Sequence, residues 1–107
     1  MADDRPGRSG GVRARVPVGT AERSRRRMEL QAECLGGVFM GSVWDSLDRP
    51  EEDWEDLLDL YRDGEDVQAT VRTHGKSHNI AAWLDKGFRA ASPQACNTWT
   101  APSSKVA

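Results

Sequence analysis

Apolar residues recur at helical spacing along the first half of the chain. Between about Glu22 and Trp44 they follow one another at intervals of four, three and four residues, which is the repeat of one face of an α-helix. These apolar residues are Met28, Ala32, Leu35 and Phe39. We expect this face to be the packed side of a first helix. Gly36 and Gly37 would each weaken that helix by about 1 kcal/mol relative to alanine, which indicates that another segment packs closely there.

Two later stretches show the same kind of repeat. A second helix is predicted after Asp48 and Pro50, because an acidic side chain can cap a helix and proline favours its first turn, and Gly64 is expected to end it. The apolar stripe of this helix consists of Trp54, Leu57, Leu58 and Tyr61. Ser77 can cap a third helix. The buried side of the third helix is expected to contain Ile80, Trp83, Leu84, Gly87 and Phe88.

The remaining segments are shorter, and none reads as a strand. Residues 63–72 fit either a short helix or a loop, and Ser92 with Pro93 predicts a helical turn around Gln94 to Cys96. No alternating apolar pattern, hairpin turn or internal repeat occurs. The fold class is therefore mainly α, with about three helices. We expect the tryptophans Trp44, Trp54, Trp83 and Trp99 to anchor the core.

Composition divides the chain into three parts. Residues 1–22 read as a disordered Arg/Gly/Pro-rich tail, residues 23–100 as the helical region, and residues 101–107 as a second disordered tail. Residues 1–27 carry eight arginines against three acids, and residues 28–107 carry seven basic against fourteen acidic side chains. The basic arm permits contact with nucleic acid, but it has no aromatic residue to stack on a base. We therefore rank a solvated tail first and a nucleic-acid contact last.

Neither export nor membrane insertion is predicted from the chain itself. No apolar run approaches the roughly 20 residues needed to cross a bilayer, and the N-terminus lacks the apolar stretch of a secretory signal. A cytoplasmic location is the default expectation. Cys34 and Cys96 are too few for a disulfide framework and form no CxxC pair. Taken alone, they are expected to be buried thiols.

Glu29 and Glu33 lie four residues apart and so share one face of the first helix. Such a pair usually lies on a solvent-exposed face of a helix. Met28 and Ala32 flank it, however, so the two carboxylates are expected near the packed side of the helix. A carboxylate held there needs a cation, a metal or backbone donors as a partner.

Three segments together resemble the bacterial neutral zinc metallopeptidase family. Residues 27–39 resemble its RMELQADCLAGVW stretch, residues 73–77 (Thr-His-Gly-Lys-Ser) its THGSS-type motif, and residues 95–99 (Ala-Cys-Asn-Thr-Trp) its ACDTF-type segment. Trp83, Gly87 and Phe88 follow the second motif at the family's spacing. The resemblance spans about residues 27 to 99. It implies a small helical remnant of a zincin-like domain, from a family of anchored extracytoplasmic proteins.

The resemblance also implies roles for individual residues. Glu29 matches the third zinc ligand of the family, and Glu33 replaces an aspartate that would orient a ligand histidine. The extra methylene of Glu33 moves its carboxylate by about 1.5 Å, which disturbs that contact. Both cysteines match family positions, so a disulfide between Cys34 and Cys96 is implied there.

The chain departs from the family most clearly in what it lacks. It contains no HExxH, the helical motif that supplies two zinc-binding histidines and the glutamate that activates water, and hence no catalytic residue can be named. A single carboxylate binds zinc too weakly to compete with the hydration of the ion, so we expect no zinc to be bound by this chain alone. Of the two histidines, His74 precedes the third helix and is expected to line a pocket, and His78 is expected on the surface. Ile80 falls where the family has arginine.

Two functions compete ahead of nucleic-acid binding. The first is a truncated or degenerate metallopeptidase-like protein without proteolytic activity alone. The second is an interaction module whose exposed apolar helix faces bind a separate chain, which itself supplies HExxH. A coding region that extends upstream and includes HExxH would make the enzyme whole.

Overall fold

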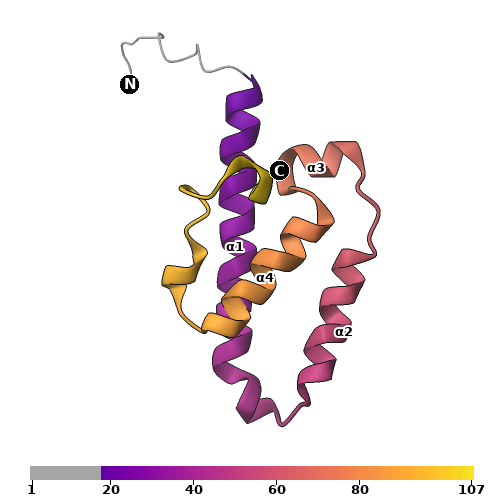
Figure 1. The fold of residues 1–107 in the computed structure, drawn as a ribbon, viewed down its shortest axis with the longest axis vertical. Coiled ribbons are helices and arrows are strands. Elements are labelled where there is room, and N and C mark those ends of the chain that lie inside the picture. Colours follow the sequence, from indigo (N-terminus) through magenta and orange to yellow (C-terminus); the bar gives the residue numbers. More distant parts are fainter. Residues whose placement is uncertain (1–17) are drawn as a thin grey trace, which may run out of the picture.

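The computed structural model describes residues 18–107, and within this part all regular structure is helical (Figure 1). The prediction of a mainly α fold is therefore confirmed. The predicted disorder of residues 1–17 lies outside the described residues, whereas residues 18–22 of that predicted tail belong to the first helix. The elements are α1 (Val18–Leu47), α2 (Glu51–Arg62), α3 (Gln68–His74), α4 (Ser77–Ala90) and two 3-10 turns, η2 (Pro93–Cys96) and η3 (Ser103–Lys105).

Helix α4, helix α3 and the turn η2 all pack against the long helix α1. Helix α4 crosses α1, α2 lies beyond α4, and the segment after α4 returns along α1 (Figure 1). The prediction that this apolar face of α1 is packed is wrong, because Met28, Leu35 and Phe39 are 52%, 43% and 63% exposed. The buried side of α1 instead contains Leu30, Cys34 and Gly37.

Glycines decide which side of α1 is covered. A Cβ on Gly37 would collide with the carbonyl of Leu84 in α4, and a Cβ on Gly87 would collide with the carbonyl of Cys34 in α1. The two helix backbones therefore touch, which only glycine permits at these positions. The predicted close approach is confirmed at Gly37, whereas at Gly36 nothing lies within 4 Å of an added Cβ.

Helix α2 packs on α4 through aromatic side chains. Trp54 and Leu58 are fully buried, and the ring of Trp54 stacks on that of Phe88 with centroids 4.0 Å apart. Trp44 of α1 meets both rings edge-on, at 5.9 Å from Trp54 and 5.3 Å from Phe88. The two edge-on contacts are favourable for aromatic quadrupoles. Of the four tryptophans predicted in the core, Trp99 is the exception, because it is 49% exposed.

The helix starts differ in detail from those predicted. Pro50 precedes α2 without a side-chain cap, and Asp48 adopts a φ of 53° instead of capping. Residues 63–72, for which helix and loop were both open, form a loop followed by most of α3. Ser77 is the first residue of α4, and its N–H donates to Asp66 Oδ1 at 2.8 Å, so the cap comes from Asp66. The short turn predicted near Gln94 is confirmed as η2.

The prediction of a disordered tail over residues 101–107 is wrong. Val106 is only 3% exposed and belongs to the core with Leu30 and Trp83. The indole Nε1 of Trp83 donates to the carbonyl of Lys105 at 2.8 Å, and Asn79 Nδ2 donates to two further carbonyls of the segment. Buried donors on α4 thus hold a segment whose own composition gives no sign of order.

Candidate functional site at the contact of α1 and α3

The glutamates of α1 and the histidine at the end of α3 form one cluster. His74 Nε2 lies 3.6 Å from Glu29 Oε1, and the two side chains are 50% and 38% exposed. Thr73 Oγ1 lies 2.7 Å from His74 Nδ1 and shares a hydrogen bond with it. The structure therefore brings together Glu29 and His74, which the resemblance treated as separate motifs, and places Glu33 one helical turn further along α1.

Local structure explains why His74 faces α1. Gly75 has a φ of 92°, which favours glycine, and this conformation ends α3 and turns the chain into α4. Arg26 of α1 donates to the carbonyl of Arg72 at 3.0 Å, and the Arg72 side chain lies 3.5 Å from Glu22. These contacts hold the short helix α3 against the N-terminal half of α1.

The surroundings of Glu33 disfavour the charged form of its carboxyl group. Partial burial raises the pKa of its carboxyl group, the nearby charge of Glu29 raises this pKa further, and His74 lowers it. Burial and a like charge both disfavour the ionised form. Glu33 therefore holds its proton more readily than a solvated glutamate.

The cluster supplies too few donors for zinc by itself. A zinc site in a protein uses three or four nitrogen, sulfur or oxygen ligands, and here only one imidazole and one carboxylate lie close together. Within residues 18–107 no group of three or more His, Cys, Asp or Glu side chains is arranged to hold a metal ion. His78 is exposed on α4, as expected, and does not join His74 on one helix face.

The two cysteines are joined. Cys34 of α1 and Cys96 of η2 form a disulfide, as the resemblance implied, instead of remaining the buried thiols expected from their number alone. Gln31 Nε2 donates to the carbonyl of Cys96 at 3.0 Å, and Thr98 Oγ1 donates to the carbonyl of Arg27 at 2.6 Å. The segment after α4 is thus fixed along the same helix that carries Glu29 and Glu33.

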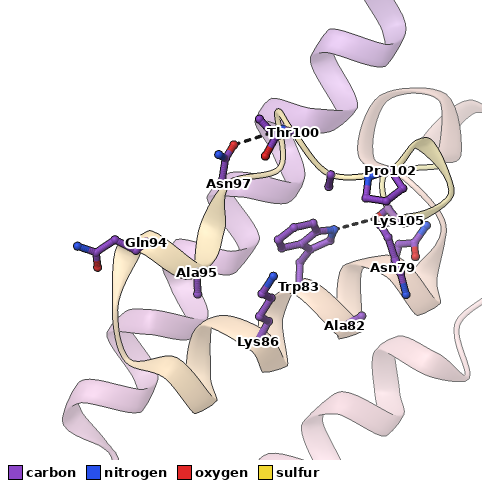
Figure 2. Close-up of a pocket in the computed structure, with 11 residues that line it drawn as sticks. Asn79, Ala82, Trp83, Lys86, Gln94, Ala95, Asn97, Thr100, Pro102 and Lys105 are labelled. Carbon is purple, nitrogen blue, oxygen red and sulfur yellow. Dashed lines mark hydrogen bonds between the residues drawn. The ribbon is translucent and has the colours of Figure 1, made fainter.

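One feature of the fold corresponds to no motif in the sequence. A cavity of about 450 Å³ lies between α4 and the segment after it, with Trp83, Lys86 and Lys105 among its lining residues (Figure 2). The two lysines lie 19 positions apart in the sequence and belong to no motif, so only the fold brings them together.

Two properties of the whole described part bear on location and on the basic arm. None of the helices within residues 18–107 is both long and apolar enough to span a membrane.

Arg26 donates to the carbonyl of Val106 at 3.2 Å and Arg27 to that of Ala101 at 3.0 Å, so both side chains contact the segment after α4. These two arginines are therefore engaged within the fold.

Comparison with known proteins gives a limited match. Two curated proteins, both called uncharacterized protein YpfJ, one from Escherichia coli K12 and one from Escherichia coli O6:H1 strain CFT073, are 31% identical to this chain over 84 residues. The match covers 68% of this chain and 29% of each relative, so the chain spans less than a third of the length of these proteins. No family model and no solved structure matches.

Proposed function

We propose that this chain corresponds to the C-terminal helical part of a neutral zinc metallopeptidase-like protein and has no proteolytic activity alone. The observation that carries the proposal is the approach of Glu29 to His74, with 3.6 Å between Oε1 and Nε2. Glu29 matches the third zinc ligand of the family and His74 belongs to the THGSS-type motif, so residues of two separate motif segments lie side by side. The pairing of Cys34 with Cys96, two further motif positions, supports the same origin.

The chemistry of the cluster limits what the chain does alone. Glu29 offers one oxygen ligand and His74 one nitrogen ligand, and the general base and the two histidines of HExxH are absent from the sequence. Glu29 is therefore proposed as one zinc ligand of a composite site, completed only when another segment supplies HExxH. Glu33 stands where the family's aspartate would orient one of the incoming histidines, and its extra methylene disturbs that contact.

Metal content and hydrolysis test this proposal directly. The purified chain, incubated with one equivalent of zinc and then desalted, is expected to retain substoichiometric zinc by inductively coupled plasma mass spectrometry. It is also expected to leave unfolded casein intact. The matched variant Glu29→Gln should give the same two results. One tightly held zinc per chain with cleavage that a chelator stops, both lost in Glu29→Gln, would refute the proposal.

A second function is favoured by the exposed face of α1. Met28, Leu35 and Phe39 are exposed apolar side chains on the side of the helix opposite Leu30 and Cys34. Met28 directly precedes Glu29, so a segment lying on this stripe passes beside the cluster. We propose that the stripe binds a protein segment that carries HExxH, which would bring the missing ligands to Glu29.

The state of the isolated chain tests the second function. An uncovered stripe favours association, so the wild-type chain is expected to sediment as a concentration-dependent mixture and the double variant Leu35→Glu, Phe39→Glu as a monomer. Circular dichroism must show equal helix content in both. Glu52→Gln, on the exposed face of α2, serves as a control with unchanged assembly. A monodisperse wild-type monomer with slow, global amide-exchange protection would rule out this function.

A further inference from the structure

The cavity beside α4 has a rigid wall. Trp83 is 6% exposed, and its indole N–H is held by the carbonyl of Lys105. The facing segment is fixed by the disulfide at Cys96 and by Asn79, which donates to the carbonyls of Ser104 and Ala107. A site that is already formed loses little conformational entropy on binding. The volume of about 450 Å³ lies in the range of small-molecule sites.

The charge of the cavity contrasts with that of the chain. Lys86 and Lys105 line it, and the described residues that line it include no carboxylate, although the whole chain has a net charge of −2. Within residues 18–107 neither lysine forms an ion pair, whereas Arg62 and Arg89 each contact two or more carboxylates. Positive charge in a concave site attracts an anion.

The remaining lining groups define the rest of the ligand. Ala82, Trp83, Ala95 and Pro102 provide apolar surface, and the ammonium of Lys86 lies 4.9 Å from the ring centroid of Trp83. Figure 2 shows Trp83 between Lys86 and the turn at Asn97 and Thr100. Asn97 Oδ1 already accepts the N–H of Thr100 at 3.3 Å, which holds the carboxamide in place at the rim.

We infer that this cavity binds a small organic carboxylate whose apolar body lies against Trp83 and whose charge is attracted by the two lysines of the lining, Lys86 and Lys105. The inference goes beyond the proposed function, because the cavity shares no residue with the cluster of Glu29, Glu33 and His74. The ligand is either the carboxylate end of a peptide or a small free acid, and both present the same chemistry.

Paired probes test the inference. N-acetylphenylalanine, which resembles a peptide end, and 3-phenylpropionate, a free acid, are titrated against the ¹⁵N-labelled chain, with N-acetylphenylalaninamide as the uncharged control. The Trp83 indole resonance reports binding, because Trp83 lines the cavity and its N–H donates to Lys105, which also lines it. We expect saturable shifts with a dissociation constant in about the millimolar range for at least one acid, and none for the amide. Tighter binding of one acid identifies which source the cavity prefers.

Variants separate the cavity from the rest of the surface. Lys86→Gln with Lys105→Gln is expected to weaken binding by about tenfold or more, and Ala82→Trp to abolish it by filling the cavity from the exposed side of α4. Lys76→Gln, an exposed lysine outside the cavity, should bind as the wild type does. Unchanged helix content by circular dichroism shows that each variant is folded. Equal shifts from the amide, no shifts from either acid, or unchanged binding by the double lysine variant would each overturn the inference.

Discussion

At the residue scale, Glu33 carries the clearest electrostatic cost among the described residues. Its carboxyl group is partly buried, faces the charge of Glu29, and is only partly compensated by His74. Within residues 18–107, the only opposite charge that acts on this carboxyl group is that of His74. A charge kept at a cost, next to the proposed ligand Glu29, fits a position that is completed only by an incoming group.

This cost predicts how stability depends on pH. The folded-state pKa of Glu33 is raised, so between the ordinary glutamate pKa and this raised value the folded state binds more protons than the unfolded state. The contribution of Glu33 to stability therefore falls as pH rises through that window. Glu33→Gln should unfold at a higher temperature than the wild type at about pH 7, and the difference should shrink at about pH 3.5. Thermal unfolding followed by circular dichroism measures both.

Glu52→Gln provides the control for that prediction. Glu52 is an exposed glutamate of α2, away from the cluster. Its replacement should not reproduce the stabilisation expected for Glu33→Gln. If Glu33→Gln were less stable than the wild type at about pH 7, the carboxylate would be making a favourable contact and the electrostatic assignment would be wrong.

At the element scale, the packing of α1 on α4 depends on the absence of side chains. Gly37 faces the backbone carbonyl of Leu84 in α4, and Gly87 faces the backbone carbonyl of Cys34 in α1. Because both neighbours are backbone atoms, no change of side-chain rotamer can relieve the clash of an added methyl group. The whole α1–α4 contact is built around this approach. The cores on either side of it depend on the same spacing.

Two neighbouring glycines of α1 are therefore expected to respond in opposite directions to the same substitution. Gly37→Ala should lower the free energy of unfolding by at least about 2 kcal/mol, because the helices must separate. Gly36→Ala should raise it by up to about 1 kcal/mol, because the position is open and alanine is the better helix former. Urea unfolding of the two variants makes the comparison. Equal effects would mean that α1 and α4 do not approach each other at Gly37.

Helical periodicity predicted which segments are helices better than it predicted which sides are buried. In α1 the buried positions Leu30, Cys34 and Gly37 follow the same four-and-three spacing as the exposed Met28, Ala32 and Leu35. Two stripes with one period cannot be ranked by periodicity alone. The prediction rests on the more apolar stripe, whereas the close approach of α4 at Gly37 determines which side is buried.

The site was predictable in part for similar reasons. Glu29 and Glu33 followed from their spacing and the resemblance, but the approach of His74 depends on the positive φ of Gly75, which a sequence pattern does not give. The order of residues 101–107 depends on donors from Asn79 and Trp83 on another helix. The cavity depends on both the ordered conformation of this segment and the disulfide, so no local sequence pattern predicts it.

At the scale of the whole molecule, two buried clusters share α4 but differ in how they are closed. The first contains Leu30, Trp83 and Val106 together with the disulfide between α1 and η2. The second is the aromatic cluster around Trp54 and Phe88, where α2 meets α4. The first cluster relies on a covalent bond to hold the segment after α4, whereas the second relies on packing.

Reduction of the disulfide should therefore destabilise the fold strongly. Cys34 and Cys96 are 62 positions apart, and closing a loop of that size in the unfolded chain is worth about 4 kcal/mol. Urea unfolding with and without a reductant should show a loss of this order. The double variant Cys34→Ala, Cys96→Ala should already be less stable than the wild type without a reductant, and the reductant should not change its stability further. An unchanged unfolding midpoint on reduction would show that the bridge does not form in solution.

The aromatic cluster also gives the molecule an optical signature. Trp44 of α1 and Trp54 of α2 hold their indoles 5.9 Å apart and inclined at 75°, close enough for their excited states to couple. Coupled indoles in a fixed chiral arrangement give an exciton couplet in the circular dichroism spectrum. The couplet would vanish when α2 leaves α1, even while each helix persists. The chain therefore contains its own label-free probe for the docking of α2, separate from the signal of helix content.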